Sequence, residues 1–365
     1  MVAPVMPAAA LGRPTTPFIG ADARALGRLT DWSVLPAGDP QGLRAALPPL
    51  TRFTTSGTTG RPVGWWRTRE QLVAEATYLC ELLDVDQVDM IITQAPVHHL
   101  YGFLTGCLVP ALGGLPVTHW RTGEPFPVTA GSPLVVTVPA SWWAMSRCLP
   151  ALAGLDRLTM VHSTAYLPPA AAQVCQALPE ATLTELHGST EAGLVGVRRA
   201  RGARATDPQV PFALAPDVSF APGMPRDRQA PLAVASPRLA ADESGAAPAH
   251  HVLDDLVEVT GSRSYRMTGR RTRLVKVNGR RVDLDAVESA LRAAVPGTAL
   301  TCVVVREDVR GEWYDVVVAD EAQRRRVAMA VGRVLTAADA PRRVRVDVTR
   351  EPAGHRDVPL DGGTA

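Results

Sequence analysis

The segment Thr54–Pro62 constrains this chain more than any other stretch of its sequence. It holds four threonines, one serine and two glycines in nine residues, directly ahead of a helical pattern over Arg69–Leu83. Glycine lets main-chain N–H groups approach a ligand closely, and hydroxyl groups add donors for phosphate oxygens. The segment therefore predicts a loop that binds a polyphosphate, with a Ser/Thr/Gly-rich surface turn as the alternative.

This loop lacks the lysine of the common phosphate-binding loops. A Walker-type loop requires Gly-x-x-x-x-Gly-Lys-Ser/Thr, in which the lysine reaches the phosphates. Here Arg61 follows Gly60, and Lys276 is the only lysine among the 38 Lys and Arg residues. The ordinary nucleoside-triphosphatase interpretation is therefore excluded, and any step that needs a lysine ammonium has one candidate.

The composition is that of a globular protein of about two or three domains. The net charge of +2 over 365 residues gives no electrostatic argument for a nucleic-acid or membrane partner. The five cysteines are scattered, which argues against a disulfide framework or a zinc site and favours a reducing compartment. No apolar run approaches the roughly 20 residues that cross a membrane. We expect a cytoplasmic protein.

Buried strands and helices alternate through the first half of the chain. Helices are predicted over 69–83 and 168–178, with a shorter one near Ala21–Trp32. Apolar runs predict buried strands, which lie at 90–92, 134–138, 158–162 and 182–186. This alternation predicts a mostly parallel α/β sheet.

Two further regions differ in character from this first half. Residues 199–250 are rich in Pro, Ala and Arg and predict a small β-rich subdomain with long loops; a flexible linker is the alternative. From Gly269 the pattern predicts a compact βαββαβ-like unit. Its predicted strands lie at 274–277, 300–305, 314–318 and 344–348, and its helices at 284–295 and 322–335.

A second polar motif, His187–Glu191, directly follows the predicted strand 182–186. Ligands of α/β proteins bind at the carboxyl ends of the strands, where this motif stands. A single carboxylate suits Mg²⁺, which takes few protein ligands and leaves the remaining positions to phosphates and water. In isolation, the motif could also be a loop with a helix cap.

Together the two motifs resemble those of the adenylate-forming superfamily, which includes acyl-CoA synthetases, aryl-acid ligases, peptide-synthetase adenylation domains and luciferases. The resemblance covers nearly the whole chain from about Phe53. It implies that the first loop contacts the β- and γ-phosphates through Thr55, Ser56, Gly57, Thr58, Thr59 and Gly60. In the second motif it implies nucleotide contacts from Gly188, Ser189 and Thr190, with Thr190 at the α-phosphate and Glu191 at Mg²⁺.

Other segments extend the resemblance in the expected order. Leu253–Glu258 is similar to the segment that binds the ribose hydroxyls, with Asp255 as the aspartate, and Arg270 would contact the nucleotide. Pro96–Gly102 resembles the acyl-pocket segment, in which His99 takes the place of the gating histidine. The expected lining of the substrate pocket comprises His98, His99, Tyr101, Trp142 and His187. These aromatic groups favour an aryl acid, although Trp and Tyr are equally good core residues.

The resemblance implies an α/β fold, α+β overall. Residues 1–268 would form a large N-terminal AMP-binding domain of α/β sheets, shortened at its front, with a β subdomain over about 199–268. Residues 269–365 would form a small mobile C-terminal α+β domain with its hinge near Thr272. Part of the usual acyl-side wall at the front would be either absent or contributed by a partner chain, so self-association is a further expectation.

The implied activity is ATP- and Mg²⁺-dependent activation of a carboxylic acid as an acyl-adenylate, in specialised metabolism. Transfer to a thiol would follow, either of coenzyme A or of the phosphopantetheine of an acyl carrier protein. Positioning and charge neutralisation would supply the rate of the first step. Two alternatives stay open: an adenylating ligase that forms an amide, and a non-catalytic relative that binds nucleotide or carrier protein.

The sequence departs from the family pattern at two lysines. Val63 stands where the loop normally has lysine, and Arg61 or Arg67 would have to supply that charge. His355, with Arg356 beside it, stands where the late catalytic lysine is expected, and imidazole is a poorer phosphate clamp than a fixed cation. Lys276 lies on the loop that serves the second half-reaction in the resembling enzymes. The retained lysine predicts an equipped thioester step and a weakened adenylation step, with a leftover lysine on a solvated strand as the alternative.

Overall fold

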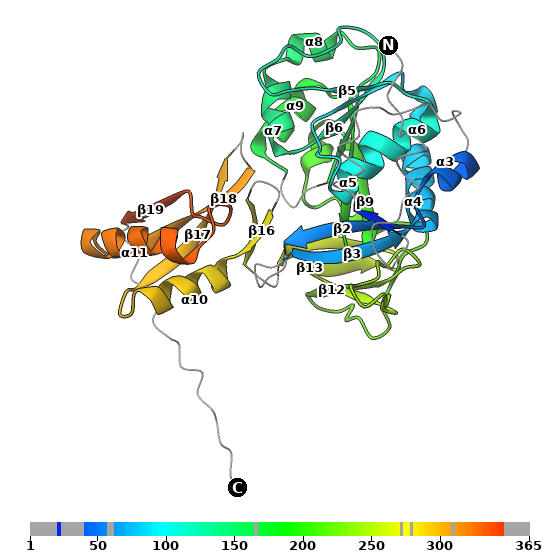
Figure 1. The fold of residues 1–365 in the computed structure, drawn as a ribbon. Helices are drawn as coiled ribbons and strands as arrows, with labels where there is room; N and C mark the ends of the chain where they lie inside the picture. The colour runs from blue at the N-terminus through cyan, green and yellow to red at the C-terminus, as the bar shows by residue number, and fades with distance from the viewer. Residues whose placement is uncertain are drawn as a thin grey trace. The chain divides into compact units, whose positions relative to one another are not determined.

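The computed structural model describes residues 20–22, 40–56, 62–163, 167–270, 273–277, 280–307 and 311–346 (Figure 1). The chain divides into two compact units, one of residues 1–272 with 307–311 and the other of residues 273–306 with 312–365. The domain boundary at 268/269 stays a prediction, and the predicted hinge residue Thr272 lies outside the described residues. Within the described part, the structure contains no helix that is both long and apolar enough to cross a bilayer.

A twisted sheet of eleven strands forms the centre of the first unit as far as it is described. In spatial order its strands are β11 (Ser219–Phe220), β12 (Ala230–Ala235), β13 (His251–Gly261), β14 (Ser264–Arg270), β10 (Phe212–Leu214), β9 (Gly193–Arg201), β8 (Thr182–Ser189), β7 (Thr159–His162), β6 (Pro133–Thr137), β4 (Met90–Thr93) and β5 (Val117–His119). Strands β5, β4, β6, β7 and β8 run parallel, and β9 returns antiparallel to β8. The predicted parallel α/β sheet is confirmed.

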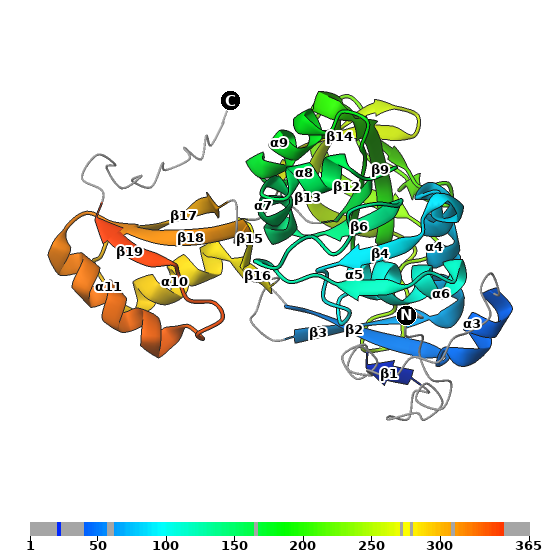
Figure 2. The ribbon, with the colours of Figure 1, turned by 90° about the horizontal axis from the view of Figure 1, so that it is seen from above.

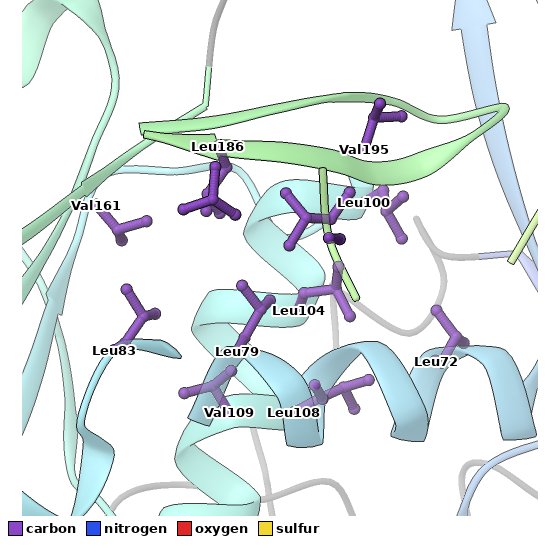
Figure 3. Packing of buried hydrophobic residues seen from close by; sticks show 14 of the residues in the cluster. Leu72, Leu79, Leu83, Leu100, Leu104, Leu108, Val109, Val161, Leu186 and Val195 are labelled. Atoms are coloured by element: carbon purple, nitrogen blue, oxygen red, sulfur yellow. The ribbon is translucent and has the colours of Figure 1, made fainter. Parts of the chain in front are cut away.

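Strands β4, β6 and β7 are buried on both faces, and successive residues of each strand point to opposite sides of the sheet. Ile91 packs into one hydrophobic cluster and Ile92 into the other. The first cluster contains helices α4 (Arg69–Leu82), α5 (Leu100–Phe103) and α6 (Val109–Gly113), and the second contains α7 (Pro139–Ser146) and α9 (Pro169–Ala177). Figure 3 shows the first cluster, in which Leu79, Leu104 and Leu108 gather below Leu186 and Val195 of the sheet.

The region from residue 199 to 268 is not a separate sheet. Its strands β10 to β14 continue the central sheet through the antiparallel pairs β9–β10 and β10–β14 (Figure 2). The strands β11 and β12 agree with the predicted β-rich character of residues 199–250, and the flexible-linker alternative is wrong for the part described. The sequence could not reveal this continuity, because strand pairing across long loops depends on tertiary packing.

A hairpin precedes helix α4 and carries the predicted phosphate loop at its tip. Strands β2 (Leu50–Ser56) and β3 (Pro62–Thr68) pair antiparallel, from Leu50 opposite Thr68 to Ser56 opposite Pro62. Thr68 begins α4 with a reciprocal capping box, in which its hydroxyl accepts from the Gln71 amide at 3.1 Å and Gln71 Oε1 accepts from the Thr68 amide at 3.0 Å. This cap fixes where strand β3 turns into the helix.

Upstream of this hairpin the structure describes two short elements. They are β1 (Gly20–Asp22), parallel to β2, and α3 (Pro40–Ala46). The helix predicted near Ala21–Trp32 is therefore wrong for its first two residues, which lie in β1. Residues 23–32 lie outside the described residues. Helix α3 was not expected from the sequence.

The second unit alternates strands and helices as expected. Strands β15 (Leu274–Val277) and β16 (Arg280–Asp283) pair antiparallel, and β17 (Leu300–Glu307), β18 (Gly311–Val318) and β19 (Arg343–Val346) form a second sheet. Helices α10 (Leu284–Ala294) and α11 (Glu321–Val334) begin at the aspartate caps Asp283 and Asp320. Both helices and the four predicted strands are confirmed, and β16 is an additional strand.

Candidate functional site

The flanks of the first loop are described, and its tip is not. Thr55 lies on β2, where its Oγ1 accepts a hydrogen bond of 3.1 Å from Trp65 Nε1 on β3. Ser56 is the last residue of β2. The remaining predicted phosphate ligands lie outside the described residues, namely Gly57, Thr58, Thr59 and Gly60. Their phosphate contacts stay predictions.

The second motif forms the tight turn between β8 and β9. Ser189 Oγ accepts from the Ala192 amide at 3.1 Å and so closes the turn. At Gly188 the register shifts, and a Cβ there would overlap the Gly193 carbonyl, whose carbon would lie 2.9 Å away. Only glycine fits this close approach of two main chains. The turn therefore holds Ser189, Thr190 and Glu191 at the carboxyl end of β8.

A buried arginine joins the strand that follows the first loop to the second motif. Arg67 lies on β3, six residues after Arg61, and its side chain is fully buried. Its Nη2 and Nε donate to the main-chain carbonyl of Thr190 at 3.0 and 3.2 Å. The strand that leaves the first loop therefore contacts the turn of the second motif, although 123 residues separate Arg67 from Thr190 in the sequence.

An acidic side chain on α4 compensates the charge of Arg67. Glu75 Oε2 lies 3.3 Å from Arg67 Nη1, and Glu75 Oε1 accepts from the Leu194 amide at 2.7 Å and lies 3.4 Å from Arg238 Nη1. Burial lowers the pKa of the Arg67 guanidinium, and the carboxylate of Glu75 opposes that shift. Because these bonds commit Arg67 to the protein, Arg61 is left as the candidate for the missing loop charge.

Glu191 is nearly buried within the same turn. Its main-chain carbonyl accepts from the Ala240 amide at 2.8 Å, and its carboxylate is close enough to act on the pKa of Arg67. Among the described residues, no group of three or more His, Cys, Asp or Glu side chains could form a complete metal cage. A single carboxylate with oxygen-bearing neighbours fits Mg²⁺, which keeps most of its ligands from phosphates and water.

The predicted ribose segment lies on the antiparallel half of the same sheet. Asp255 faces inward from β13, opposite Arg270 of β14 in the register. Its Oδ2 accepts from His187 Nε2 at 3.0 Å, and His187 Nδ1 lies 2.6 Å from the Tyr265 hydroxyl. The structure therefore brings Asp255 beside the first residue of the second motif. Of Arg270 only the main chain is described.

Residues of the predicted acid pocket lie near the carboxyl ends of the parallel strands. His98 and His99 are half-buried with their ring centroids 4.3 Å apart, and His99 directly precedes α5. The Tyr101 hydroxyl donates to the Val161 carbonyl at 2.8 Å and so attaches α5 to β7. Trp142 is fully buried, and its Nε1 donates to His162 Nδ1 at 3.1 Å. That these residues line an acid pocket, with His187, stays a prediction.

The predicted residues of the second half-reaction are described only in part. Lys276 lies on β15 opposite Arg281, and only its main chain is described. His355 and Arg356 lie outside the described residues. The roles of Lys276 and His355 therefore stay predictions.

Three residues that hold the site together were not predicted from the sequence, namely Glu75, Tyr265 and Arg238. Glu75 could have been recognised in the sequence, because it interrupts the apolar face that Leu72, Ala76 and Leu79 form on α4. A charge on a buried helix face requires a partner. Tyr265 and Arg238 gave no such signal, because their contacts with His187 and Glu75 join segments far apart in the sequence.

Comparison with known proteins agrees with this arrangement. The family model described as "AMP-binding enzyme" matches residues 45–218. A 4-coumarate–CoA ligase of Rhodobacter capsulatus is 28% identical over 305 residues, which are 80% of this chain and 69% of the relative.

Solved structures of related fold include a malonyl-CoA ligase in complex with methylmalonyl-CoA and AMP. It is 22% identical with a TM-score of 0.59, over 82% of this chain and 70% of that one. An amide bond synthetase from Marinactinospora thermotolerans is 20% identical with a TM-score of 0.59, over 82% of this chain and 65% of that one. This chain therefore spans about two thirds of the length of these proteins. The matched segment and the fold agree with the resemblance inferred from the motifs: residues 45–218 match a family of AMP-binding enzymes, and the chain has the fold of these solved ligases.

Proposed function

We propose that this protein uses ATP to activate a carboxylic acid as an acyl-adenylate and then transfers the acyl group to a thiol. The observation that carries the proposal is the bond from Arg67 to the Thr190 carbonyl. It joins the strand after the hydroxyl-rich loop to the turn that bears Thr190 and Glu191. The two motifs suited to phosphate and Mg²⁺ are therefore carried by elements in direct contact, which supports their assignment to one site.

In the first step the acid carboxylate attacks the α-phosphorus of ATP, and pyrophosphate leaves. The protein binds and orients the reactants and offsets the charge that develops on the phosphate oxygens. The hydroxyl-rich loop binds the β- and γ-phosphates, Thr190 contacts the α-phosphate, and Asp255 accepts from the ribose hydroxyls. Glu191 would hold Mg²⁺, which would neutralise phosphate charge when it is bound.

In the second step a thiolate attacks the acyl carbon, and AMP leaves. We assign Lys276 to this step, with a rotation about Thr272 that presents β15 to the site. His355 would contact the α-phosphate region during adenylation, with a weaker clamp than lysine gives. Lys276 is the only lysine of the chain, and its position on β15 supports its assignment to the second step.

For the acid we favour an aryl carboxylate. The relative named 4-coumarate–CoA ligase and the aromatic residues of the α5 segment support an aryl acid. His99 would gate the entry of the carboxylate. The acceptor is coenzyme A or the phosphopantetheine of a carrier protein, and the name of that relative favours coenzyme A.

A pyrophosphate-release assay tests the proposal. The protein is incubated with ATP, Mg²⁺ and a panel of aryl and aliphatic acids, with and without coenzyme A. We expect acid-dependent pyrophosphate release and an acyl-CoA product detected by mass spectrometry. Release with amines but not with thiols would assign an amide-forming ligase instead, and no release with any acid would favour a non-catalytic relative.

Glu191→Gln provides the matched variant for this assay. We expect pyrophosphate release to fall roughly 100-fold, because a metal-bound phosphate loses its protein anchor. The control is Glu180→Gln, since the Glu180 side chain is 92% exposed and pairs only at 3.7 Å with Arg201. Equal activity of the two variants would contradict the role of Glu191.

A further inference from the structure

Three side chains from three strands form a hydrogen-bonded relay beneath the predicted ribose site. Tyr265 of β14 contacts His187 of β8 at 2.6 Å, and His187 contacts Asp255 of β13 at 3.0 Å. Tyr265 is fully buried, and His187 and Asp255 are nearly so. The relay therefore connects the second motif on β8 to the predicted ribose carboxylate on β13.

A glycine leaves room for this relay. In the sheet order, β9 and β10 lie between β8 and β14, and Gly196 of β9 stands directly opposite His187. A Cβ at Gly196 would overlap the Tyr265 hydroxyl and would lie 2.9 Å from Cζ of that ring. Tyr265 cannot move aside easily, because its ring stacks on Phe212 with 5.7 Å between centroids. The absent side chain at Gly196 thus lets the Tyr265 hydroxyl reach His187.

The protons of the relay follow from the chemistry of its members. Burial raises the pKa of Tyr265 well above its usual value, and the nearby charges of Asp255 and Glu185 raise it further. Tyr265 therefore remains a phenol and donates its proton to Nδ1 of His187. The imidazole then carries its own proton on Nε2 and donates it to Asp255, which accepts as a carboxylate.

We propose that His187 is a positioning residue that aims the Asp255 carboxylate at the vicinal hydroxyls of the nucleotide ribose, with Tyr265 fixing its tautomer. The inference rests on the proposed function, because it requires a bound nucleotide. It differs from the expectation that His187 lines the acid pocket, since His187 acts here on the nucleotide. A carboxylate held from behind keeps the geometry for two ligand hydroxyls without losing side-chain entropy on binding.

Calorimetric titrations with ATP and with 2′,3′-dideoxy-ATP, both with Mg²⁺, test this role. The variants are His187→Leu, which removes the donor, His187→Gln, which restores an N–H, and Tyr265→Phe, which removes only the hydroxyl. Controls are His119→Leu on the edge strand β5 and Tyr314→Phe in the second unit. If His187 and Tyr265 were only structural, the substitutions would weaken the binding of both nucleotides alike. If they act at the ribose, the substitutions weaken only the binding of ATP.

We expect His187→Leu to weaken ATP binding roughly tenfold, the loss for one hydrogen bond to a charged group, and to leave the dideoxy analogue unchanged. His187→Gln should regain part of the loss, and Tyr265→Phe should show a smaller loss of about threefold. Equal weakening of both nucleotides, or unchanged discrimination in His187→Leu and Tyr265→Phe, would overturn the relay with the proposed function intact. If the wild-type protein binds neither nucleotide, the proposed function fails and the relay falls with it.

Discussion

Glu75 and Arg67 form a fully buried ion pair of 3.3 Å between the first helix after the loop and the strand that leaves it. The same carboxylate lies 3.4 Å from Arg238, which is itself buried and bonded to Asp217 by two contacts of 2.7 Å. One negative charge therefore serves two buried guanidinium groups. Removing it takes the paired carboxylate away from the buried Arg67, whereas Arg238 keeps its two bonds to Asp217.

We therefore expect Glu75→Gln to lower the free energy of unfolding by about 3–5 kcal/mol, the cost of an uncompensated buried charge. Urea denaturation followed by circular dichroism measures this loss. Glu70→Gln is the control on the same helix, because the Glu70 side chain is 58% exposed and its pair with Arg69 should contribute about 1 kcal/mol or less. Similar midpoints for the two variants would show that the buried network does not hold the hairpin to the turn.

The parts of the candidate site that lie in short polar motifs of the sequence were predictable. The hydroxyl-rich loop, the turn at Gly188–Glu191 and Asp255 each stand in short polar motifs next to strands, so their types and positions could be recognised. The parallel strands were predictable for the same reason, since their apolar runs are buried on both faces. The Arg67–Thr190 bond and the Tyr265 relay were not predictable, because each joins segments that only the sheet brings together.

The second unit supplies a prediction for the thiol step. Lys276→Ala should slow acyl transfer to coenzyme A by about 100-fold, because the transition state loses a positioned cation. ATP–pyrophosphate exchange should stay close to the wild-type rate. Lys276→Arg keeps the charge with a different geometry and is expected to recover part of the transfer. Equal slowing of exchange and transfer in Lys276→Ala would contradict the assignment of this lysine to the second step.

Glu288 should make helix α10 sensitive to acid. Burial alone would raise the pKa of Glu288, but the Cys302 amide at 2.7 Å and the guanidinium groups of Arg273 and Arg292 outweigh it and lower the pKa. A lowered carboxylate pKa contributes stability that is present above the unfolded-state value of 4.5 and lost as the pH falls through the folded-state value.

Hydrogen exchange of peptides from residues 284–294 at several pH values measures this loss. We expect protection of α10 to fall below about pH 4.5 in the wild type. In Glu288→Gln it should already be reduced at neutral pH and should change little with acid. Glu321→Gln on the exposed start of α11 is the control and should leave the α10 peptides unchanged. Acid sensitivity of α10 that persists in Glu288→Gln would assign the effect to another carboxylate.

Gly196 and Gly332 offer a matched pair of substitutions with opposite expected signs. A methyl group at Gly196 would collide with the buried Tyr265 ring, so Gly196→Ala should destabilise the protein by about 1–3 kcal/mol and reduce its preference for ATP over the dideoxy analogue. Gly332 lies in α11 with no atom within 4 Å of an added Cβ, so Gly332→Ala should stabilise the helix by about 0.5–1 kcal/mol. Thermal unfolding and nucleotide titration of both variants check the pair. If Gly196→Ala matched the wild type in stability and selectivity, Tyr265 would have room to move. The Tyr265 hydroxyl would then not need a glycine at position 196 to reach His187.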